Sequence, residues 1–154
     1  MSAFLVIGYG NTLRRDDGAG PWVAQRITNL LGTAVDCWIE RQLLPEMAER
    51  ISQAQRVVFV DAQSGTTEMQ VRQLRLDAPS PATGTHYCDP TNLLTLAATL
   101  FGSAAPLAWL VTIPADDFSH GEGLSATTWH HAERAVEWIV TELQRFQSED
   151  SPPT

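Results

Sequence analysis

Nearly continuous apolar runs alternate along this chain with segments of helical periodicity, and this alternation limits the fold more than any other feature. The runs Phe4–Ile7, Val57–Val60 and Leu107–Ile113 contain almost no polar residue, which is typical of strands that helices cover on both faces. Val35–Ile39 is a further candidate strand. Met69–Leu76 carries two Gln and two Arg, so we expect a half-exposed, antiparallel strand at an edge of the sheet.

Amphipathic helices are expected between these strands. Pro21–Leu31 stops before a glycine, Pro45–Ala54 has a proline in its first turn, Asp89 and Pro90 open a third helix, and the last helix begins near Ser125–Thr128. The positions expected to face the core are Val23, Ile27, Leu30, Leu31, Met47, Ile51, Ala54, Leu93, Leu96, Ala97, Leu100, Phe101, Trp129, Ala132, Val136, Ile139, Val140, Leu143 and Phe146.

This order of elements predicts an α/β fold. The expected architecture is a three-layer α/β/α sandwich around a mostly parallel five-stranded sheet with one antiparallel edge strand. With 154 residues the chain has the size of one domain. We expect that domain over residues 1–147, followed by a polar, disordered tail over residues 148–154.

The charge and cysteine content exclude several classes of function. The chain has 18 acidic and 10 basic residues, a net charge of −8, and no Lys, which does not suit binding to nucleic acid. Two cysteines are too few for a disulfide framework. We expect no cleavable leader, because no basic region precedes the first apolar run, and there is no run of roughly 18 apolar residues that would span a membrane. We therefore expect a cytoplasmic protein that binds neither nucleic acid nor membranes.

A glycine-rich loop, Gly8–Gly20, follows the first strand and precedes the first helix. It does not match a dinucleotide-binding fingerprint, because Leu13 replaces the third glycine. Asp16 and Asp17 stand where a pyrophosphate would lie, and the absence of Lys excludes a P-loop. Carboxylates at this position suit a cation, although either Asp also suits a helix cap.

Three potential metal ligands follow three different elements. Asp17 lies in the loop after the first strand, Asp61 directly follows Val57–Val60, and His86 lies in the long loop before the third helix. Ligands bind beyond the carboxyl ends of parallel strands, and two carboxylates with one imidazole suit a first-row divalent ion. Two alternatives to metal binding remain open. Asp61 also suits hydrogen bonding to loop amides, and His86 also suits a surface position in its loop. A nucleophilic pair of Cys88 with His86 is a weaker alternative.

At these residues the sequence resembles the hydrogenase maturation proteases. Gly8–Leu13 followed by Asp16–Gly20 is similar to the family signature G-x-G-N-x-L-x-x-D-[DE]-G-x-G. Val58–Ala62 resembles the family's next strand and its acid, His86 falls where the family places a histidine before a helix, and Gly121–Ser125 resembles the late G-x-G-L-S segment. The resemblance covers nearly the whole chain.

The resemblance implies an endopeptidase that removes the C-terminal extension of a [NiFe]-hydrogenase large-subunit precursor after nickel insertion. Asp17, Asp61 and His86 fall on the family's metal-contacting positions, so the nickel is expected to arrive with the substrate, and no tightly bound metal is expected in the free enzyme. Asp16 is expected to be a general base or a helix cap. The alternatives are a non-catalytic chaperone of the nickel-loaded large subunit and a nucleotide-binding α/β oxidoreductase.

The sequence departs from the family's pattern at three places. Glu40–Leu43 replaces a frequent D-G-G-T and resembles proteases that serve bidirectional or group-specific hydrogenases, which leaves open which large subunit is processed. Asn92 stands where Asp is frequent, and Asp17 is shorter by one methylene than the Glu of some members.

Overall fold

The computed structural model describes residues 2–76, 88–102 and 104–149. At its centre lies a five-stranded sheet in the order β2-β1-β3-β5-β4. Strands β1, β2, β3 and β5 run parallel, whereas β4 is antiparallel to β5 at one edge. The predicted α/β class and the antiparallel edge strand are therefore confirmed. The strands are β1 (Phe4–Tyr9), β2 (Asp36–Glu40), β3 (Arg56–Gln63), β4 (Gln70–Leu74) and β5 (Leu107–Pro114).

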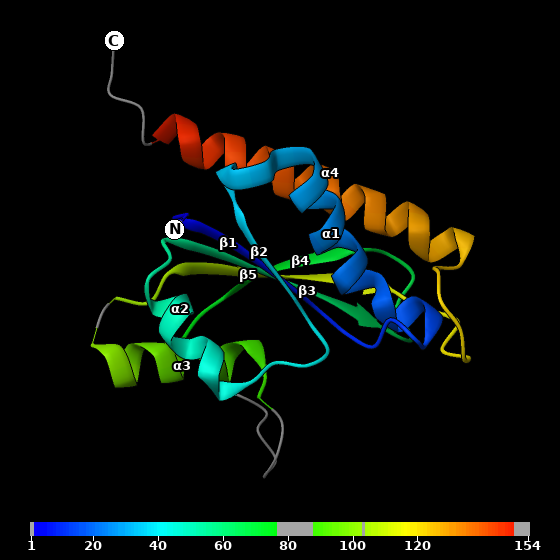
Figure 1. The fold of residues 1–154 in the computed structure, drawn as a ribbon, viewed down its shortest axis with the longest axis horizontal. Helices are drawn as coiled ribbons and strands as arrows, with labels where there is room; N and C mark the ends of the chain where they lie inside the picture. Colours follow the sequence, from blue (N-terminus) through cyan, green and yellow to red (C-terminus); the bar gives the residue numbers. More distant parts are fainter. Residues whose placement is uncertain (1, 77–87, 103, 150–154) are drawn as a thin grey trace.

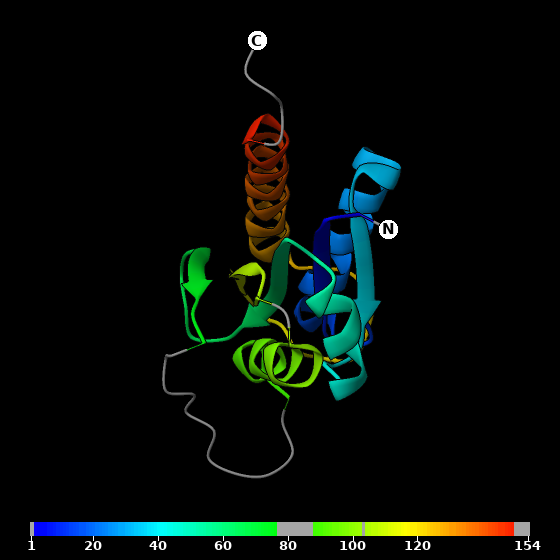
Figure 2. The same ribbon diagram turned by 90° about the vertical axis from the view of Figure 1, so that its left-hand side faces the viewer.

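Helices cover both faces of the sheet, as expected (Figures 1 and 2). α1 (Ala19–Leu31) and α4 (Ala126–Glu149) lie on one face, and α2 (Ala48–Ser52) and α3 (Pro90–Phe101) lie on the other. The expected helix over residues 45–54 is shorter and divided, because it begins as the 3-10 turn η3 (Pro45–Met47). Two further 3-10 turns in the described residues are η1 (Arg15–Gly18) and η2 (Gly32–Ala34).

Two apolar clusters fill the spaces between the three layers. Val6, Val58 and Val111 point to the face of α1 and α4, while Leu5, Val57 and Phe59 point to the face of α2 and α3. Alternate residues of one strand thus enter opposite clusters, because successive side chains of a strand point to opposite faces. Burial on both sides explains why β1 and β3 are nearly continuous apolar runs.

Four of the predicted core positions are wrong. Leu30, Leu100, Phe101 and Trp129 are 55%, 62%, 44% and 41% exposed. In α1 the buried side follows Val23 and Ile27 rather than Leu30. The last turn of α3 extends past the short α2 (Figure 1), which leaves Leu100 and Phe101 uncovered. In their place Leu94, which the periodicity did not select, is buried.

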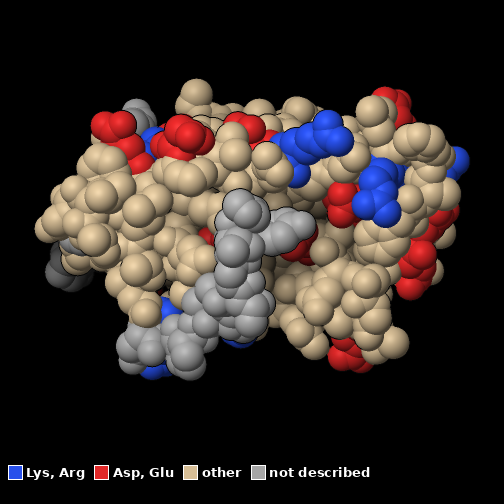
Figure 3. All heavy atoms as spheres, turned by 90° about the horizontal axis from the view of Figure 1, so that it is seen from below, with Lys and Arg blue, Asp and Glu red and all other residues tan. Residues whose placement is uncertain are grey.

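Three further observations concern the C-terminal end, the helices and the surface. α4 continues to Glu149, two residues past the expected domain boundary, and residues 150–154 lie outside the described part. No helix of the described chain combines the length and the apolar character needed to cross a membrane. On the face that carries α2 and α3, the visible acidic and basic side chains lie mainly toward the border (Figure 3).

Candidate functional site

The glycine-rich loop after β1 folds tightly onto the ends of the central strands. Gly10 has a φ of +148°, and a Cβ atom there would lie 2.0 Å from the carbonyl oxygen of Asp17. A Cβ atom on Gly20 would lie 2.4 Å from the carbonyl oxygen of Val60 and 2.6 Å from that of Tyr9. Only glycine permits such approaches. The glycines therefore serve backbone packing, and they hold Asp17 over the carboxyl ends of β1 and β3.

Asp17 is partly buried and is held by its own loop. Its Oδ2 atom accepts a hydrogen bond of 2.8 Å from the backbone N–H of Asn11, and the Oδ1 atom of Asn11 accepts one of 3.0 Å from the N–H of Leu13. The N-cap of α1 is Gly18, with no side-chain cap. The alternative that Asp17 caps this helix is therefore wrong.

Asp61 lies near the end of β3, where its register partner on β5 is Thr112. In the strand order β2-β1-β3-β5-β4, the chain moves from β1 outward to β2 and then returns to β3 on the other side of β1. The strand order therefore reverses between β1 and β3, and Asp17 and Asp61 flank this point. Burial raises the pKa of the Asp61 carboxyl to about 6, and the nearby charge of Asp17 contributes. Hydrogen bonds from the Ala62 N–H and the Tyr9 hydroxyl oppose that rise.

Tyr9 is a member of this site that the sequence motifs did not select. It is the last residue of β1, and its hydroxyl is hydrogen-bonded to the Asp61 carboxylate. Burial, followed by the charges of Asp61 and Asp89, raises the pKa of the Tyr9 hydroxyl above its ordinary range, so the phenol remains protonated. It stands at the variable position of the G-x-G signature, where the motif provides no signal.

Asp16 has a different environment from its neighbour Asp17. It is fully buried, and its carboxylate contacts two segments that are about a hundred residues away in the sequence. Its partners are the N–H groups of Asp116 (3.0 Å), Asp117 (2.9 Å) and Ser125 (2.7 Å) and the hydroxyls of Ser125 (2.8 Å) and Thr128 (2.9 Å). Asp16 thereby binds the loop after β1 to the segment between β5 and α4.

The pKa of Asp16 reflects this network. Burial alone would raise the pKa, but the backbone N–H groups and the Ser125 hydroxyl outweigh burial and lower it to about 2. A general base needs access to a proton donor and a pKa near the working pH, so this environment does not suit that role. Asp16 does not cap α1 either. Ser125 caps α4, as expected, by accepting a hydrogen bond from the Thr128 N–H.

The loop after β1 and the segment between β5 and α4 also meet through their backbones. The N–H of Arg15 donates to the carbonyl of Gly121 at 3.0 Å, and the N–H of Gly121 donates to the carbonyl of Leu13 at 2.9 Å. The late glycine-rich segment therefore packs on the first loop, which explains why both belong to one sequence pattern.

His86 lies outside the described residues, so the structure does not place the third expected ligand. Three positions later in the sequence, Asp89 caps α3 by accepting a hydrogen bond of 2.7 Å from the Asn92 N–H, and its charge acts on Tyr9. Burial raises the pKa of the Cys88 thiol, which disfavours a nucleophilic thiolate. Within residues 2–76, 88–102 and 104–149 no group of three His, Cys, Asp or Glu side chains is arranged to hold a metal.

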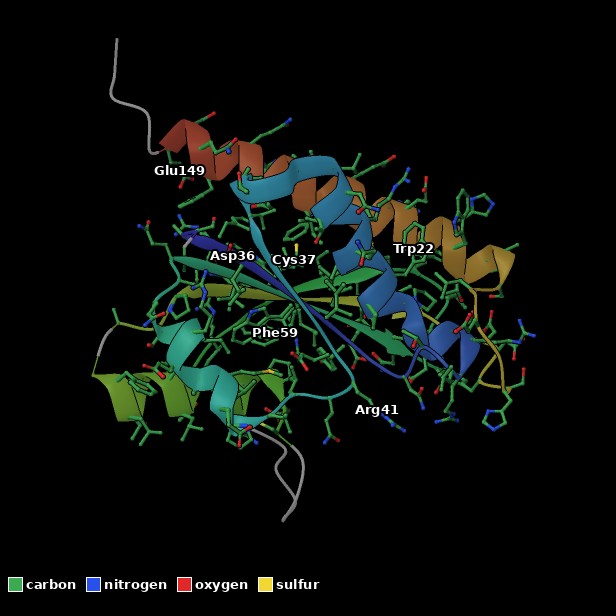
Figure 4. All side chains as sticks on the ribbon, in the orientation of Figure 1. Trp22, Asp36, Cys37, Arg41, Phe59 and Glu149 are labelled. Atoms are coloured by element: carbon green, nitrogen blue, oxygen red, sulfur yellow. The ribbon has the colours of Figure 1, made fainter. Side chains whose placement is uncertain are left out.

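The segment that departs from the family's pattern borders this site. The Glu40 carbonyl accepts a hydrogen bond of 3.0 Å from the N–H of Gly10, so the end of β2 contacts the glycine-rich loop. Arg41 and Gln42 are exposed, whereas Leu43 is buried. Arg41 projects from the turn after β2 (Figure 4). At the other end of the same strand, Asp36 pairs with Arg50.

Comparison with known proteins gives matches among solved structures only. No protein-family model and no curated protein matches this chain. A [NiFe] hydrogenase maturation protease, HycI from Thermococcus kodakarensis KOD1, is 25% identical, with a TM-score of 0.69 and 92% of each chain covered. The hydrogenase maturating endopeptidase HybD from E. coli is 20% identical, with a TM-score of 0.73 and 92% of each chain covered.

A third structure, the [NiFe] hydrogenase maturation protease HybD from Thermococcus kodakarensis, is 19% identical, with a TM-score of 0.70 and coverage of 91% of this chain and 98% of that chain. The fold is that of the hydrogenase maturation proteases. The family resemblance predicted from the motifs is thus confirmed by the three-dimensional structure. The matches span nearly all of each chain.

Proposed function

We propose that this chain is an endopeptidase that removes the C-terminal extension of a [NiFe]-hydrogenase large-subunit precursor after nickel insertion. Its structural relatives are hydrogenase maturation proteases. The observation that carries the proposal is the position of Asp17 and Asp61, which lie beyond or at the carboxyl ends of the adjacent strands β1 and β3. Both are partly buried, so substrate can still reach them.

In this proposal Asp17, Asp61 and His86 complete the coordination of a nickel ion that the substrate already holds. Burial and the neighbouring Asp17 make the ionised form of Asp61 costly, and a divalent cation would relieve that cost by neutralising both carboxylates. A metal fixed beside the scissile carbonyl can polarise it or lower the pKa of a bound water. A precursor without nickel would bind more weakly, so cleavage would follow metal insertion.

Asp16 has a structural role in this mechanism. Its network holds the segment that follows β5 against the loop that carries Asp17. Asp17 is the next residue in the chain, so the position of its backbone depends on that contact. We therefore assign substrate contact to Asp17, Asp61 and His86, and positioning of the loop to Asp16.

The test is the intact mass of a large-subunit precursor incubated with the purified protein, with nickel-loaded and nickel-free precursor in parallel. We expect loss of a C-terminal peptide from the nickel-loaded precursor only. Asp61→Asn and His86→Ala should abolish cleavage. Asp116→Asn and His130→Ala are matched controls at exposed positions and should process the precursor normally. Complex formation with unchanged mass would indicate a chaperone, and cleavage by Asp61→Asn at the normal rate would contradict the proposed site.

A further inference from the structure

Tyr9 occupies a position from which it acts directly on Asp61. The register of β1 and β3 pairs Gly8 with Val60, so Tyr9 and Asp61 are the next residues along two adjacent parallel strands. The ring of Tyr9 packs against the apolar cluster between the sheet and α2 and α3. Because the ring is held in this way, the position of the hydroxyl oxygen is restricted as well.

The hydroxyl of Tyr9 is hydrogen-bonded to the Asp61 carboxylate. A carboxylate has about four lone-pair directions, and the Tyr9 hydroxyl and the Ala62 N–H lower the pKa of Asp61 as hydrogen-bond donors. The hydroxyl therefore restricts rotation of the carboxylate and leaves its remaining lone pairs for other ligands. Donors that contact a metal-binding carboxylate commonly orient it in this manner.

We propose that Tyr9 is a positioning residue for the reaction, whose hydroxyl orients the Asp61 carboxylate toward the nickel carried by the substrate. This inference rests on the proposed function. Tyr9 does not contact the reacting atoms and acts only through Asp61. The packing of its ring and the hydrogen bond of its hydroxyl are separable, because Tyr9→Phe removes the second and keeps the first.

The experiment compares wild type, Tyr9→Phe and the control Thr141→Val. Thr141 donates its hydroxyl to the Glu137 carbonyl within α4, so the control removes a hydroxyl away from the strand ends. We expect Tyr9→Phe to lower kcat/KM for the nickel-loaded precursor by about 10- to 100-fold, the usual effect of losing such a partner. Binding of the nickel-free precursor, which does not use Asp61, should be unchanged.

Two results would overturn the inference. One is a normal kcat/KM in Tyr9→Phe. The other is an equal loss of affinity for nickel-free and nickel-loaded precursor, which would make Tyr9 a packing residue only. Circular dichroism and a melting curve establish that each variant is folded. Failure of the proposed function can be told apart from failure of this inference. In the first case the wild type itself would cleave neither precursor, and the role of Tyr9 would be refuted as well.

Discussion

Replacement of Asp16 by Asn should destabilise the fold strongly, although Asn has nearly the same shape. The Oδ2 atom of Asp16 accepts hydrogen bonds from two backbone N–H groups, and Oδ1 accepts one from the Ser125 N–H. An Asn side chain has one oxygen and one NH2 group. In either orientation, the NH2 group would face at least one buried backbone N–H, and the negative charge would be lost.

The structure indicates the size of the effect. The pKa of Asp16 is lowered from 3.8 to about 2, and at about 1.4 kcal/mol per pKa unit the ionised carboxylate contributes about 2.5 kcal/mol to folding. A buried N–H without an acceptor adds about 1–3 kcal/mol. We therefore expect Asp16→Asn to lose about 3–5 kcal/mol, which corresponds to a fall in Tm of roughly 6–20 °C for a domain of this size.

Urea unfolding followed by tryptophan fluorescence measures this difference, and Asp116→Asn is the matched control. Asp116 lies next to the network but its side chain is exposed, so its replacement should change stability by less than about 0.5 kcal/mol. Since the folded pKa of Asp16 is depressed, its contribution is present above pH 4 and is lost as the pH falls toward 2. Equal stability of Asp16→Asn and wild type at pH 7 would refute the reasoning.

Three further predictions concern stability. Asp61→Asn should raise the free energy of unfolding at pH 7.5 by up to about 3 kcal/mol, because the pKa of Asp61 in the folded protein is raised from 3.8 to about 6. This gain in stability should vanish below about pH 4. A variant that is less stable than wild type at pH 7.5 would contradict the prediction. Gly20→Ala should prevent stable folding, because its Cβ would lie 2.4 Å from a backbone oxygen. Gly102→Ala, at a position in the left-handed conformation with a φ of +62° and open space, should cost only about 1–2 kcal/mol by the same denaturation assay. Arg50→Ala should lose about 2–4 kcal/mol, since it leaves a carboxylate without its buried partner, yet processing should stay normal because the pair lies at the opposite end of the sheet.

The mostly parallel sheet and the two helical layers were accessible from the sequence because burial leaves a strong pattern. A strand with helices on both faces must be apolar at every position, as in Val57–Val60. The errors occurred where neighbours, not periodicity, decide exposure. Leu100 and Phe101 continue an apolar stripe, but α3 extends past α2 and leaves them exposed. The apolar pattern of α3 does not give the length of α2, the helix that packs beside it.

The candidate site was accessible only in part. The positions of Asp17 and Asp61 follow from a topological rule about strand ends, and the structure places both there. The partners of Asp16 did not follow from any local pattern, since Ser125 and Thr128 are more than a hundred positions away. Tyr9 was also missed, because its significance arises from pairing between β1 and β3 and not from the motif that contains it.

Three aspartates of this chain differ in their chemistry because of what surrounds them. Asp16 is covered by donors from a distant segment, and its pKa falls to about 2. Asp61 receives fewer donors and lies beside another carboxylate, so burial dominates and its pKa rises to about 6. The charge of Asp17, the neighbour of Asp16 in the chain, contributes to this rise. One aspartate therefore stabilises the junction of two loops, while the proposed function would use the other two to contact the nickel of the substrate.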